Sequence, residues 1–294
     1  MRRVPGILLV SAFCLGAPGR SATAQGAPAQ RWDTVAAILE TTAVPSSGYV
    51  RFNFPRRDLT VRMGDVTLAV PLAAGAWAGF AGTASGAMTM GDLVLTESEL
   101  KPVLVELERQ HIEVTGIHNH LVGEEPRLIY VHFHAAGEAP ALAARLDSVL
   151  ARTAIPRPVA SAAAPPATAD TALIYSSLGA TGRAQGNVVQ LGFDLVRRRV
   201  EWQGETLVPA LAYATPINIQ VVSPSRTVAT GDFALTARQV PAVLAALAAH
   251  GITAEALHTH MVGESPPVYF IHFWADGPLA DVVQGIKAAL DAAR

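Results

Sequence analysis

The sequence predicts an α+β fold of two tandem repeats, each a mostly antiparallel sheet with helices on one face, packed as a pseudo-twofold pair. A histidine-rich segment, His118-Asn119-His120-Leu121-Val122-Gly123-Glu124, recurs 258 − 118 = 140 residues later as His258-Thr259-His260-Met261-Val262-Gly263-Glu264. Residues 91–137 and 231–277 align without a gap and agree at 18 of 47 positions. Each copy reads strand, helix, strand, strand, helix, an order that places helices on one face of a sheet.

The first residues are typical of a secretion signal, predicted to be cleaved after residues 1–24. Arg2-Arg3 precede an apolar run at 6–17, and small residues follow at 22–24. The run is shorter than the about 20 apolar residues of a membrane span. We therefore expect a periplasmic or secreted protein with no transmembrane segment. Cys14, the only cysteine, follows Phe13 where a lipid anchor requires a small residue, so a lipoprotein is the less favoured alternative.

Composition excludes several classes of function. The chain of 294 residues is 50% hydrophobic and 16% charged, which suits two folded domains. Its formal net charge is −2 and its basic residues are scattered, so no nucleic-acid partner is predicted. The chain has no phosphate-binding loop, dinucleotide fingerprint or serine elbow, so no nucleotide cofactor is expected. Removal of the cysteine leaves nitrogen and oxygen ligands for any metal.

The predicted domain layout places repeat 1 at 31–150, an Ala/Pro-rich linker at 151–169 and repeat 2 at 170–294. Each repeat begins with strands: residues 49–54 and 188–193 alternate in polarity, and 63–65 and 203–205 are turn-like. The uncharged stretch 66–90 contains a proline and glycines that are unsuited to a membrane helix. Buried strands and loops are predicted there.

The next helix has an ambiguous start. Thr96 and Glu99 have the spacing of a capping box, but Pro102 inside a helix would cost about 3 kcal/mol. We therefore expect the helix to run from Pro102 to Gln110, and its counterpart to cover 241–249. Strands are then predicted at 112–120 and 128–134, with a helix at 140–150; the second copy has 252–260, 268–274 and 279–290.

The repeated histidines are typical of a metal site. Alternation along a strand places His118 and His120 on one face, about 7 Å apart, where two imidazoles can bind one metal. The returning strand brings His132 beside them, and Glu124 offers an oxygen ligand or a general base. The predicted ligands are His118, His120, Glu124 and His132, with a second set of His258, His260, Glu264 and His272. Three nitrogens and one carboxylate suit Zn, Mn, Fe or Cu.

A structural role for the same residues is the competing hypothesis. Histidines near strand ends often hydrogen-bond to backbone, and a glutamate after Gly123 can simply close the turn. His134 is a weaker candidate because Trp274 replaces it in repeat 2, while His111 and His250 are expected to cap helices. The HxHxxxE spacing also matches a cupin metal motif. No second cupin motif follows, and the predicted helices do not suit a small β-barrel.

Four segments resemble the tandem domain of the bacterial LppY/LpqO proteins over residues 32–294. These segments are GDLVLTESEL, IEVTGIHNHLVGEEPRLIYVHFH, GDFALT and LHTHMVGESPPVYFIHFW. The resemblance implies an extracytoplasmic protein of paired domains, with some lipoproteins among its relatives. It implies no particular reaction.

The main functional hypothesis is an exported protein that binds a metal ion or small ligand. The alternatives are a metal-dependent hydrolase with Glu124 or Glu264 as base, and a non-catalytic structural or interaction module. No protein partner is indicated. Repeat 1 is expected to form the better site because Asn119, Arg127 and His134 add polar groups that repeat 2 lacks.

Overall fold

Two domains of matching element order form the computed structural model, which describes residues 32–159 and 165–294. The predicted secretion signal lies outside these residues. Domain 1 contains α1 (Asp33–Ile38), β1 (Val44–Ser46), β2 (Tyr49–Pro55), β3 (Arg62–Met63), β4 (Val66–Thr67), α2 (Val70–Ala73), β5 (Gly75–Thr83), β6 (Gly86–Thr96), α3 (Glu97–Arg109), β7 (Glu113–His118), β8 (Glu124–Glu125), β9 (Leu128–Gly137) and α4 (Ala139–Leu150).

Domain 2 repeats this order with few changes. It contains α5 (Thr171–Leu178), β10 (Arg183–Gln185), β11 (Val188–Phe193), β12 (Glu201–Trp202), β13 (Glu205–Thr206), α6 (Pro209–Ala212), β14 (Thr215–Ser223), β15 (Arg226–Leu235), α7 (Val240–Ala249), β16 (Thr253–His258), β17 (Tyr269–Gly277) and α8 (Leu279–Ala292). The uncharged stretch 66–90 forms β4, α2, β5 and the start of β6, so it contains the predicted strands and also a short helix that was not predicted. Within the described ranges no helix has the length and apolar character that crossing a membrane requires.

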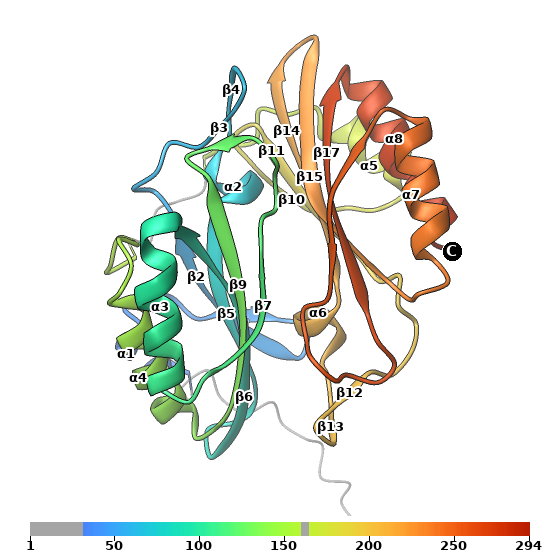
Figure 1. Ribbon diagram of the computed structural model, residues 1–294. Coiled ribbons are helices and arrows are strands. Elements are labelled where there is room, and N and C mark those ends of the chain that lie inside the picture. Colours follow the sequence, from blue (N-terminus) through green and yellow to red (C-terminus); the bar gives the residue numbers. More distant parts are fainter. Residues whose placement is uncertain (1–31, 160–164) are drawn as a thin grey trace, which may run out of the picture.

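Each domain has one six-stranded antiparallel sheet, which confirms the predicted fold class. The strand orders correspond: β1-β2-β5-β6-β9-β7 in domain 1 and β10-β11-β14-β15-β17-β16 in domain 2. Helices α1, α3 and α4 cover the outer face of the first sheet, and α5, α7 and α8 cover that of the second (Figure 1). The inner faces of the two sheets are turned toward each other.

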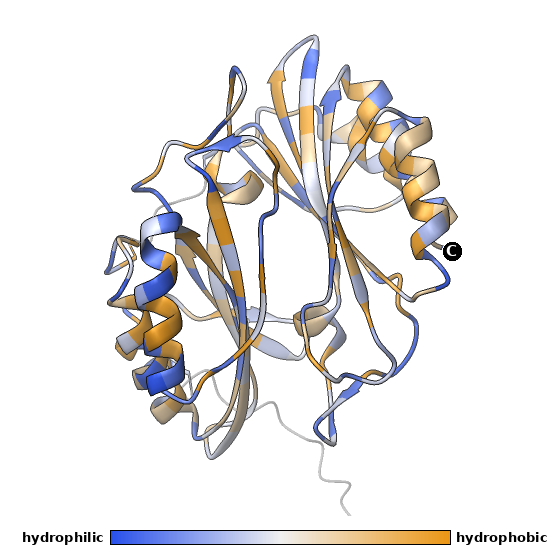
Figure 2. Ribbon diagram, in the orientation of Figure 1, coloured by the Kyte–Doolittle hydropathy of each residue, from blue (hydrophilic) through white to orange (hydrophobic). Residues whose placement is uncertain are grey.

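Amphipathic helices bury one face against each sheet. In α4, Leu142, Leu146 and Val149 recur at helical spacing and are fully buried. Hydrophilic residues lie on the solvent side of α3 and hydrophobic ones toward the sheet (Figure 2). The inner faces of the sheets are therefore free to carry the contacts between the domains.

The start of α3 differs from the prediction. The helix begins at Glu97, the Thr96–Glu99 capping box forms, and Pro102 lies inside the helix. Glu99 accepts a hydrogen bond from the Thr96 backbone N–H at 2.8 Å and pairs with Arg56 at 2.7 Å. Because these contacts fix the first turn, they outweigh the backbone hydrogen bond that Pro102 cannot donate.

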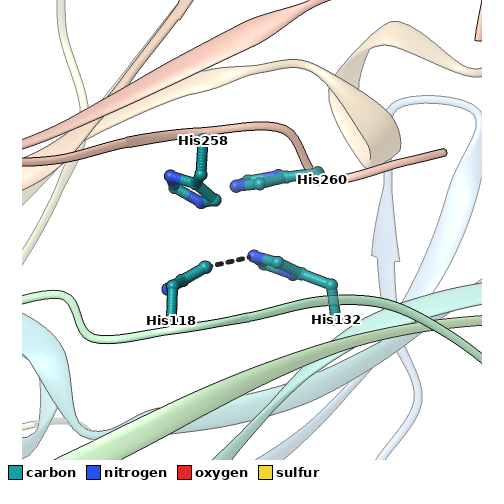
Figure 3. Close-up of side chains that lie close together, drawn as sticks. All are labelled: His118, His132, His258 and His260. Carbon is teal, nitrogen blue, oxygen red and sulfur yellow. Dashed lines mark hydrogen bonds between the residues drawn. The ribbon is translucent and has the colours of Figure 1, made fainter.

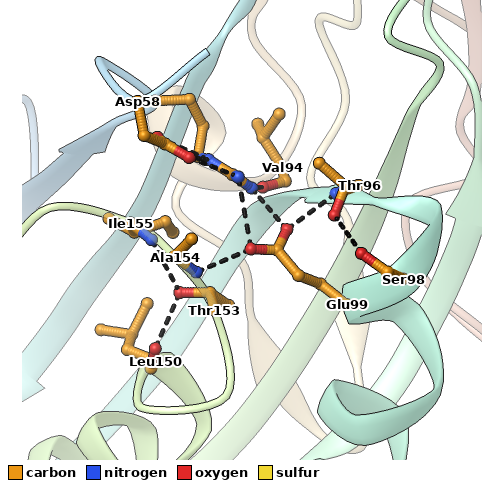
Figure 4. Close-up of polar contacts among 10 residues, drawn as sticks. Asp58, Val94, Thr96, Ser98, Glu99, Leu150, Thr153, Ala154 and Ile155 are labelled. Carbon is orange, nitrogen blue, oxygen red and sulfur yellow. Dashed lines mark hydrogen bonds and ion pairs between the residues drawn. The ribbon is translucent and has the colours of Figure 1, made fainter.

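Arg56 is the centre of a buried polar network, and its partners Asp58, Val94 and Glu99 are labelled in Figure 4. Its guanidinium is fully buried and lies 2.7 Å from carboxylate oxygens of both Asp58 and Glu99, and it donates to the Val94 carbonyl at 2.6 Å. Repeat 2 fills the position of Glu99 with Gln239, which accepts from the Thr236 N–H at 2.7 Å. The two domains therefore anchor the same helix start, one with charges and one with a neutral amide.

The short helix α2 of domain 1 lies on the inner face of the second sheet. Side-chain amides of that sheet bind the backbone around α2 and hold it there. Gln220 bonds Thr67 and Ala69 at 3.0 and 2.9 Å, Asn218 bonds Leu72 at 2.9 Å, and Gln190 bonds Pro71 at 2.9 Å. These bonds link the domains directly.

The equivalent helix α6 of domain 2 lies on the first sheet through apolar contacts. A Cβ at Gly79 would come within 2.3 Å of Leu211 Cδ1, so only glycine leaves room for this leucine. Trp202, Leu207 and Phe270 of domain 2 belong to a buried cluster that also includes Met90 of domain 1. A hydrophobic core therefore extends across the interface and holds the inner faces together.

Candidate metal centre between the domains

Local register positions the histidines of each repeat. His118 ends β7 opposite Tyr130 of β9, while His132 of β9 lies opposite both Gly116 of β7 and Asp92 of β6. The rings of His118 and His120 stack with centroids 5.1 Å apart, so they lie on one side as alternation predicts. Domain 2 repeats this arrangement, with His272 opposite Asp232 and Ala256.

The two sets of histidines lie together rather than forming two separate sites. The edge strands β7 and β16 are adjacent across the interface. We call the resulting group the histidine centre, which comprises His118, His120, His132, His258, His260 and His272. Ring centroids are 3.8 Å apart for His118–His258, 3.9 Å for His120–His272 and 3.9 Å for His132–His260. Side chains from the two domains point toward one another in Figure 3.

Possible ligand sets within the histidine centre draw on both domains. The ligand atoms of His118, His120 and His272 lie within 4.8 Å of one another. So do those of a group comprising His118, His132, His258 and His260, and those of a group comprising Asp232, His260 and His272. Two crossed triads follow: the HxH pair of each repeat combines with the third histidine of the other.

Half of the twelve ring nitrogens at the centre are buried without a hydrogen bond. Among the described residues, buried nitrogens without a hydrogen bond are His118 Nδ1, His120 Nε2, both nitrogens of His258, His260 Nε2 and His272 Nε2. Other ring nitrogens have partners: the Nε2 atoms of His118 and His132 lie 2.7 Å apart, and His272 Nδ1 lies 3.3 Å from the Gly231 carbonyl oxygen. Leaving a buried polar atom unpaired costs about 1–3 kcal/mol. These nitrogens have the lone pairs or N–H groups free that a bound ligand could satisfy.

Two aspartates beside the centre escaped the sequence-based prediction. His132 Nδ1 lies 3.8 Å from Asp92 Oδ1 and His120 Nε2 lies 3.7 Å from Asp92 Oδ2. In domain 2, His272 Nδ1 lies 2.5 Å from Asp232 Oδ1. The sequence did contain a signal for them, because the pair Gly91-Asp92 recurs 140 residues later as Gly231-Asp232 within an apolar strand.

The glycine of this pair has a steric role. A Cβ at Gly91 would lie 2.2 Å from the Trp77 carbonyl oxygen, and one at Gly231 would lie 2.1 Å from that of Pro216. The neighbouring strand therefore approaches closely just where the aspartate is held. Only glycine permits this approach.

Burial favours the neutral form of four imidazoles of the centre, those of His118, His120, His132 and His260. Desolvation lowers the pKa of His118 to about 4, with a further contribution from His272. The same cause lowers the pKa of His120, His132 and His260 well below the usual range. Neutral imidazole is the form that binds metal ions.

Asp92 responds to burial in the opposite direction. Desolvation and the nearby charge of Asp232 raise its pKa well above the usual range of a carboxyl group. A cation at the centre would supply the positive charge that this carboxylate otherwise lacks.

The two predicted glutamate ligands, Glu124 and Glu264, hydrogen-bond to the backbone of the turn that follows each HxH motif. Glu124 Oε1 accepts a hydrogen bond from the Leu128 N–H at 3.3 Å, and Glu264 Oε1 accepts one from the Val268 N–H at 3.1 Å. Neither glutamate belongs to a described group with ligand atoms in reach of one another. Both carboxyl groups close the turn after the HxH motif, which was the competing structural interpretation.

The remaining histidines also lie outside the centre. His134 packs edge-on against Trp202, with centroids 3.8 Å apart, and burial lowers its pKa to about 4. His111 follows α3 with a positive φ, and His250 is the C-cap residue of α7. These placements agree with the low weight that the sequence gave to all three.

Polar support around the centre differs from expectation. Asn119 Nδ2 donates to the Leu128 carbonyl at 2.6 Å and so holds the turn after His118. Arg127 instead forms an exposed ion pair with Glu97 at 3.4 Å. Because His134 also lies elsewhere, the expected advantage of repeat 1 rests on Asn119 alone.

Cavities border the centre on two sides. A cavity of about 520 Å³ is bounded by β7 and β16 and reaches His118 and His258. A larger cavity of about 1060 Å³ lies between the inner faces of the sheets and reaches Asp92, Asp232 and His120. A metal bound here would therefore be accessible to a small molecule.

Comparisons with known proteins identify a family but no function. The profile of a family described as Domain of Unknown Function (DUF1259) matches residues 33–152 and again residues 172–292. No curated protein matches the chain. The paired match agrees with the two domains of the structure.

Among solved structures, EtuB from Clostridium kluyveri is 11% identical, with 86% of this chain and 90% of that chain covered and a TM-score of 0.22. The double ringed trimeric shell protein MSM0271 from the RMM microcompartment is 11% identical, with 72% and 85% covered and a TM-score of 0.18. The trimeric bacterial microcompartment shell protein PduB is 9% identical, with 86% and 91% covered and a TM-score of 0.23. Scores this low do not bear on the function of this chain.

Proposed function

We propose that this chain, which belongs to the family described as Domain of Unknown Function (DUF1259), binds divalent transition metal at a centre shared by its two domains. The observation that carries the proposal is the set of buried, unpaired imidazole nitrogens that both domains contribute to the histidine centre. Neutral imidazoles with a neighbouring carboxylate suit Zn, Mn, Fe or Cu.

The geometry favours two metal positions with crossed ligands. One position would use His118, His120 and His272, and its pseudo-symmetric counterpart would use His258, His260 and His132. Asp92 and Asp232 lie beside these triads, where a carboxylate can bind the metal or orient an imidazole. Each metal would then join the two domains.

The alternative functions have less support. The hydrolase hypothesis assigned the general base to Glu124 or Glu264, and both carboxyl groups are hydrogen-bonded to backbone away from the centre. A purely structural role would require the histidines to satisfy one another or the backbone. The unpaired nitrogens at the centre argue against that role.

Export belongs to the same proposal. Residues 1–24 have the pattern of a cleaved secretion signal, and the resemblance to the LppY/LpqO proteins implies an extracytoplasmic location. Intact-mass measurement of the protein recovered from the periplasm tests this. The expected mass is that of a chain cleaved near Ala24, and a diacylglyceryl adduct on Cys14 would contradict it.

Metal content of the purified protein tests the central proposal. Inductively coupled plasma mass spectrometry of untagged protein should detect up to two equivalents of one transition metal. Replacing His118 and His120 by Ala should remove about half of it, because that pair supplies one of the two triads. His111→Ala is the control and should leave the content unchanged. Wild-type protein without stoichiometric metal, after incubation with each of Zn, Mn, Fe and Cu, would overturn the proposal.

A further inference from the structure

A row of cross-strand partners leads from the histidine centre across the inner face of the first sheet. His132 of β9 pairs with Asp92 of β6, Asp92 pairs with Trp77 of β5, and Trp77 pairs with Asn53 of β2. Adjacent strands lie about 4.8 Å apart, so Trp77 is about 10 Å from His132. This row lines the larger cavity between the domains.

Arg51 lies over the far end of this row. Its guanidinium carbon is 4.1 Å from the centroid of the Trp77 ring, and its Nε donates to Asn53 Oδ1 at 2.8 Å. The stacking and the hydrogen bond hold the planar guanidinium in one orientation. The Tyr49 side chain is the other polar neighbour.

Arg51 also lacks an ion-pair partner. In the parts of the chain that the structure describes, no carboxylate oxygen lies within 4.0 Å of its guanidinium. Burial lowers the pKa of Arg51, which shows that the cation has lost solvent, and Asp92 is the acid that acts on it at longer range. A partly desolvated cation held rigidly at a cavity wall is suited to receive an anion.

The second domain has no such group. The register-equivalent positions of Arg51, Asn53 and Trp77 are occupied by Gln190, Gly192 and Pro216. Gln190 binds the Pro71 carbonyl and thereby helps to hold α2. Because the repeat folds without the arginine and tryptophan, the fold itself does not require them.

We propose that Arg51, Asn53 and Trp77 form a subsite for a small organic carboxylate whose other end reaches the histidine centre. The contact with bound metal rests on the proposed function, whereas the capture of the carboxylate rests on Arg51. A single guanidinium matches one negative charge. A phosphate dianion is disfavoured because its second negative charge would face the carboxylate of Asp232, which lines the same cavity. The separation of about 10 Å limits the ligand to the size of an aromatic or short-chain acid.

Calorimetric titration with benzoate tests the subsite. Benzamide, which has the same shape without the charge, and inorganic phosphate are the comparison ligands. We expect benzoate to bind wild-type protein and to bind at least about tenfold more weakly to Arg51→Gln, which copies the residue of repeat 2. Arg51→Lys should fall between them, because lysine keeps the charge but not the planar fork. Arg57→Gln, an exposed arginine of the same cavity, is the matched control and should bind as wild type does.

Several outcomes would overturn the subsite. These are no benzoate binding to wild type, equal binding by Arg51→Gln in a form with wild-type circular dichroism, equal binding of benzamide, and tighter binding of phosphate. If Arg51→Gln does not fold, Arg51→Lys is compared with Arg57→Gln instead. Equal benzoate affinity in these two variants would overturn the subsite.

The same titrations on chelator-treated and zinc-loaded protein separate the two proposals. Arg51-dependent binding to metal-free protein, in a chain that retains no metal, supports the subsite and refutes the metal centre. Zinc retained by the protein, together with benzoate binding that is unchanged in Arg51→Gln, supports the metal centre and refutes the subsite. When both proposals hold, zinc should increase the affinity of wild type for benzoate.

Discussion

His120 of domain 1 and His272 of domain 2 face each other across the domain interface, with ring centroids 3.9 Å apart. The two histidines belong to different repeats, yet their ring nitrogens form one possible ligand group with His118. The duplication has therefore produced a shared centre rather than two copies of a site. The metal content of suitable double variants can therefore distinguish ligand sets drawn from both repeats from ligand sets drawn from one repeat.

The first prediction concerns paired substitutions. His120→Ala with His272→Ala should remove one metal and leave the other, because both residues belong to one crossed triad. His120→Ala with His132→Ala should weaken both metals, because it takes one ligand from each triad. Metal content per chain, measured by mass spectrometry, distinguishes the two double variants. The reverse pattern would show that each repeat binds its own metal.

A second prediction follows from ligands that come from both domains. Zinc at about 100 times its dissociation constant should stabilise the fold by about 2.7 kcal/mol for each of the two sites, because only the docked domains present complete ligand sets. Thermal unfolding with zinc and with a chelator measures the difference. The variant with both His118 and His258 replaced by Ala should lose this dependence. A metal-independent melting temperature in wild-type protein would contradict the prediction.

The third prediction concerns the buried ion pair of Arg56. Glu99→Ala should lower the free energy of unfolding by about 3–5 kcal/mol, because it leaves a fully buried guanidinium without one of its carboxylates. Gln239→Ala, at the equivalent position of repeat 2, should cost about 1–2 kcal/mol, because it removes only neutral hydrogen bonds. Chemical denaturation of the two variants provides the comparison. Equal costs would show that the charge at Glu99 does not matter.

The same carboxylate gives the fold an acid sensitivity. Burial opposes ionisation of Glu99, but hydrogen bonds from Ala154, Thr96 and Arg56 prevail and lower its pKa. A carboxyl group whose pKa is lower in the folded state contributes stability above its unfolded pKa and loses it as the pH falls through the folded value. Wild-type protein should therefore lose more stability than Glu99→Gln when both are unfolded at decreasing pH below about 4.5. Parallel pH profiles would contradict this.

Local patterns in the sequence were sufficient for the sheets and the HxH geometry. Residues 188–193 alternate in polarity and form β11 with those bounds. The stacked rings of His118 and His120 follow from the same alternation. In both cases the side-chain direction depends only on the residue's position in its own strand, because successive side chains alternate between the two faces of the sheet.

The features that escaped prediction depend on contacts between distant residues. Helix α3 tolerates Pro102 because Glu99 binds Arg56, which lies 43 positions earlier. Asp92 joins the centre because β6 pairs with β9, a partner that the local sequence does not specify. The shared centre depends on how the domains dock, which is set by contacts such as Leu211 on Gly79. No spacing within one repeat contains that information.

The last prediction concerns Glu124, which belongs to none of the ligand groups among the described residues. Burial raises the pKa of its carboxyl group to about 8, and Oε2 has no hydrogen-bond partner among the described residues. A carboxyl group whose pKa is higher in the folded state favours folding while it is protonated, and this advantage declines as the pH rises from its unfolded pKa through the folded value. Glu124→Gln keeps the shape without the charge. It should therefore be more stable than wild type at pH 9, by about 5 kcal/mol, and the difference should shrink toward pH 5. Urea unfolding across this range measures it, with Glu125→Gln as the control, because the neighbouring carboxylate is exposed to solvent. Metal content should be unchanged in both variants; loss of metal from Glu124→Gln would return the glutamate to the site.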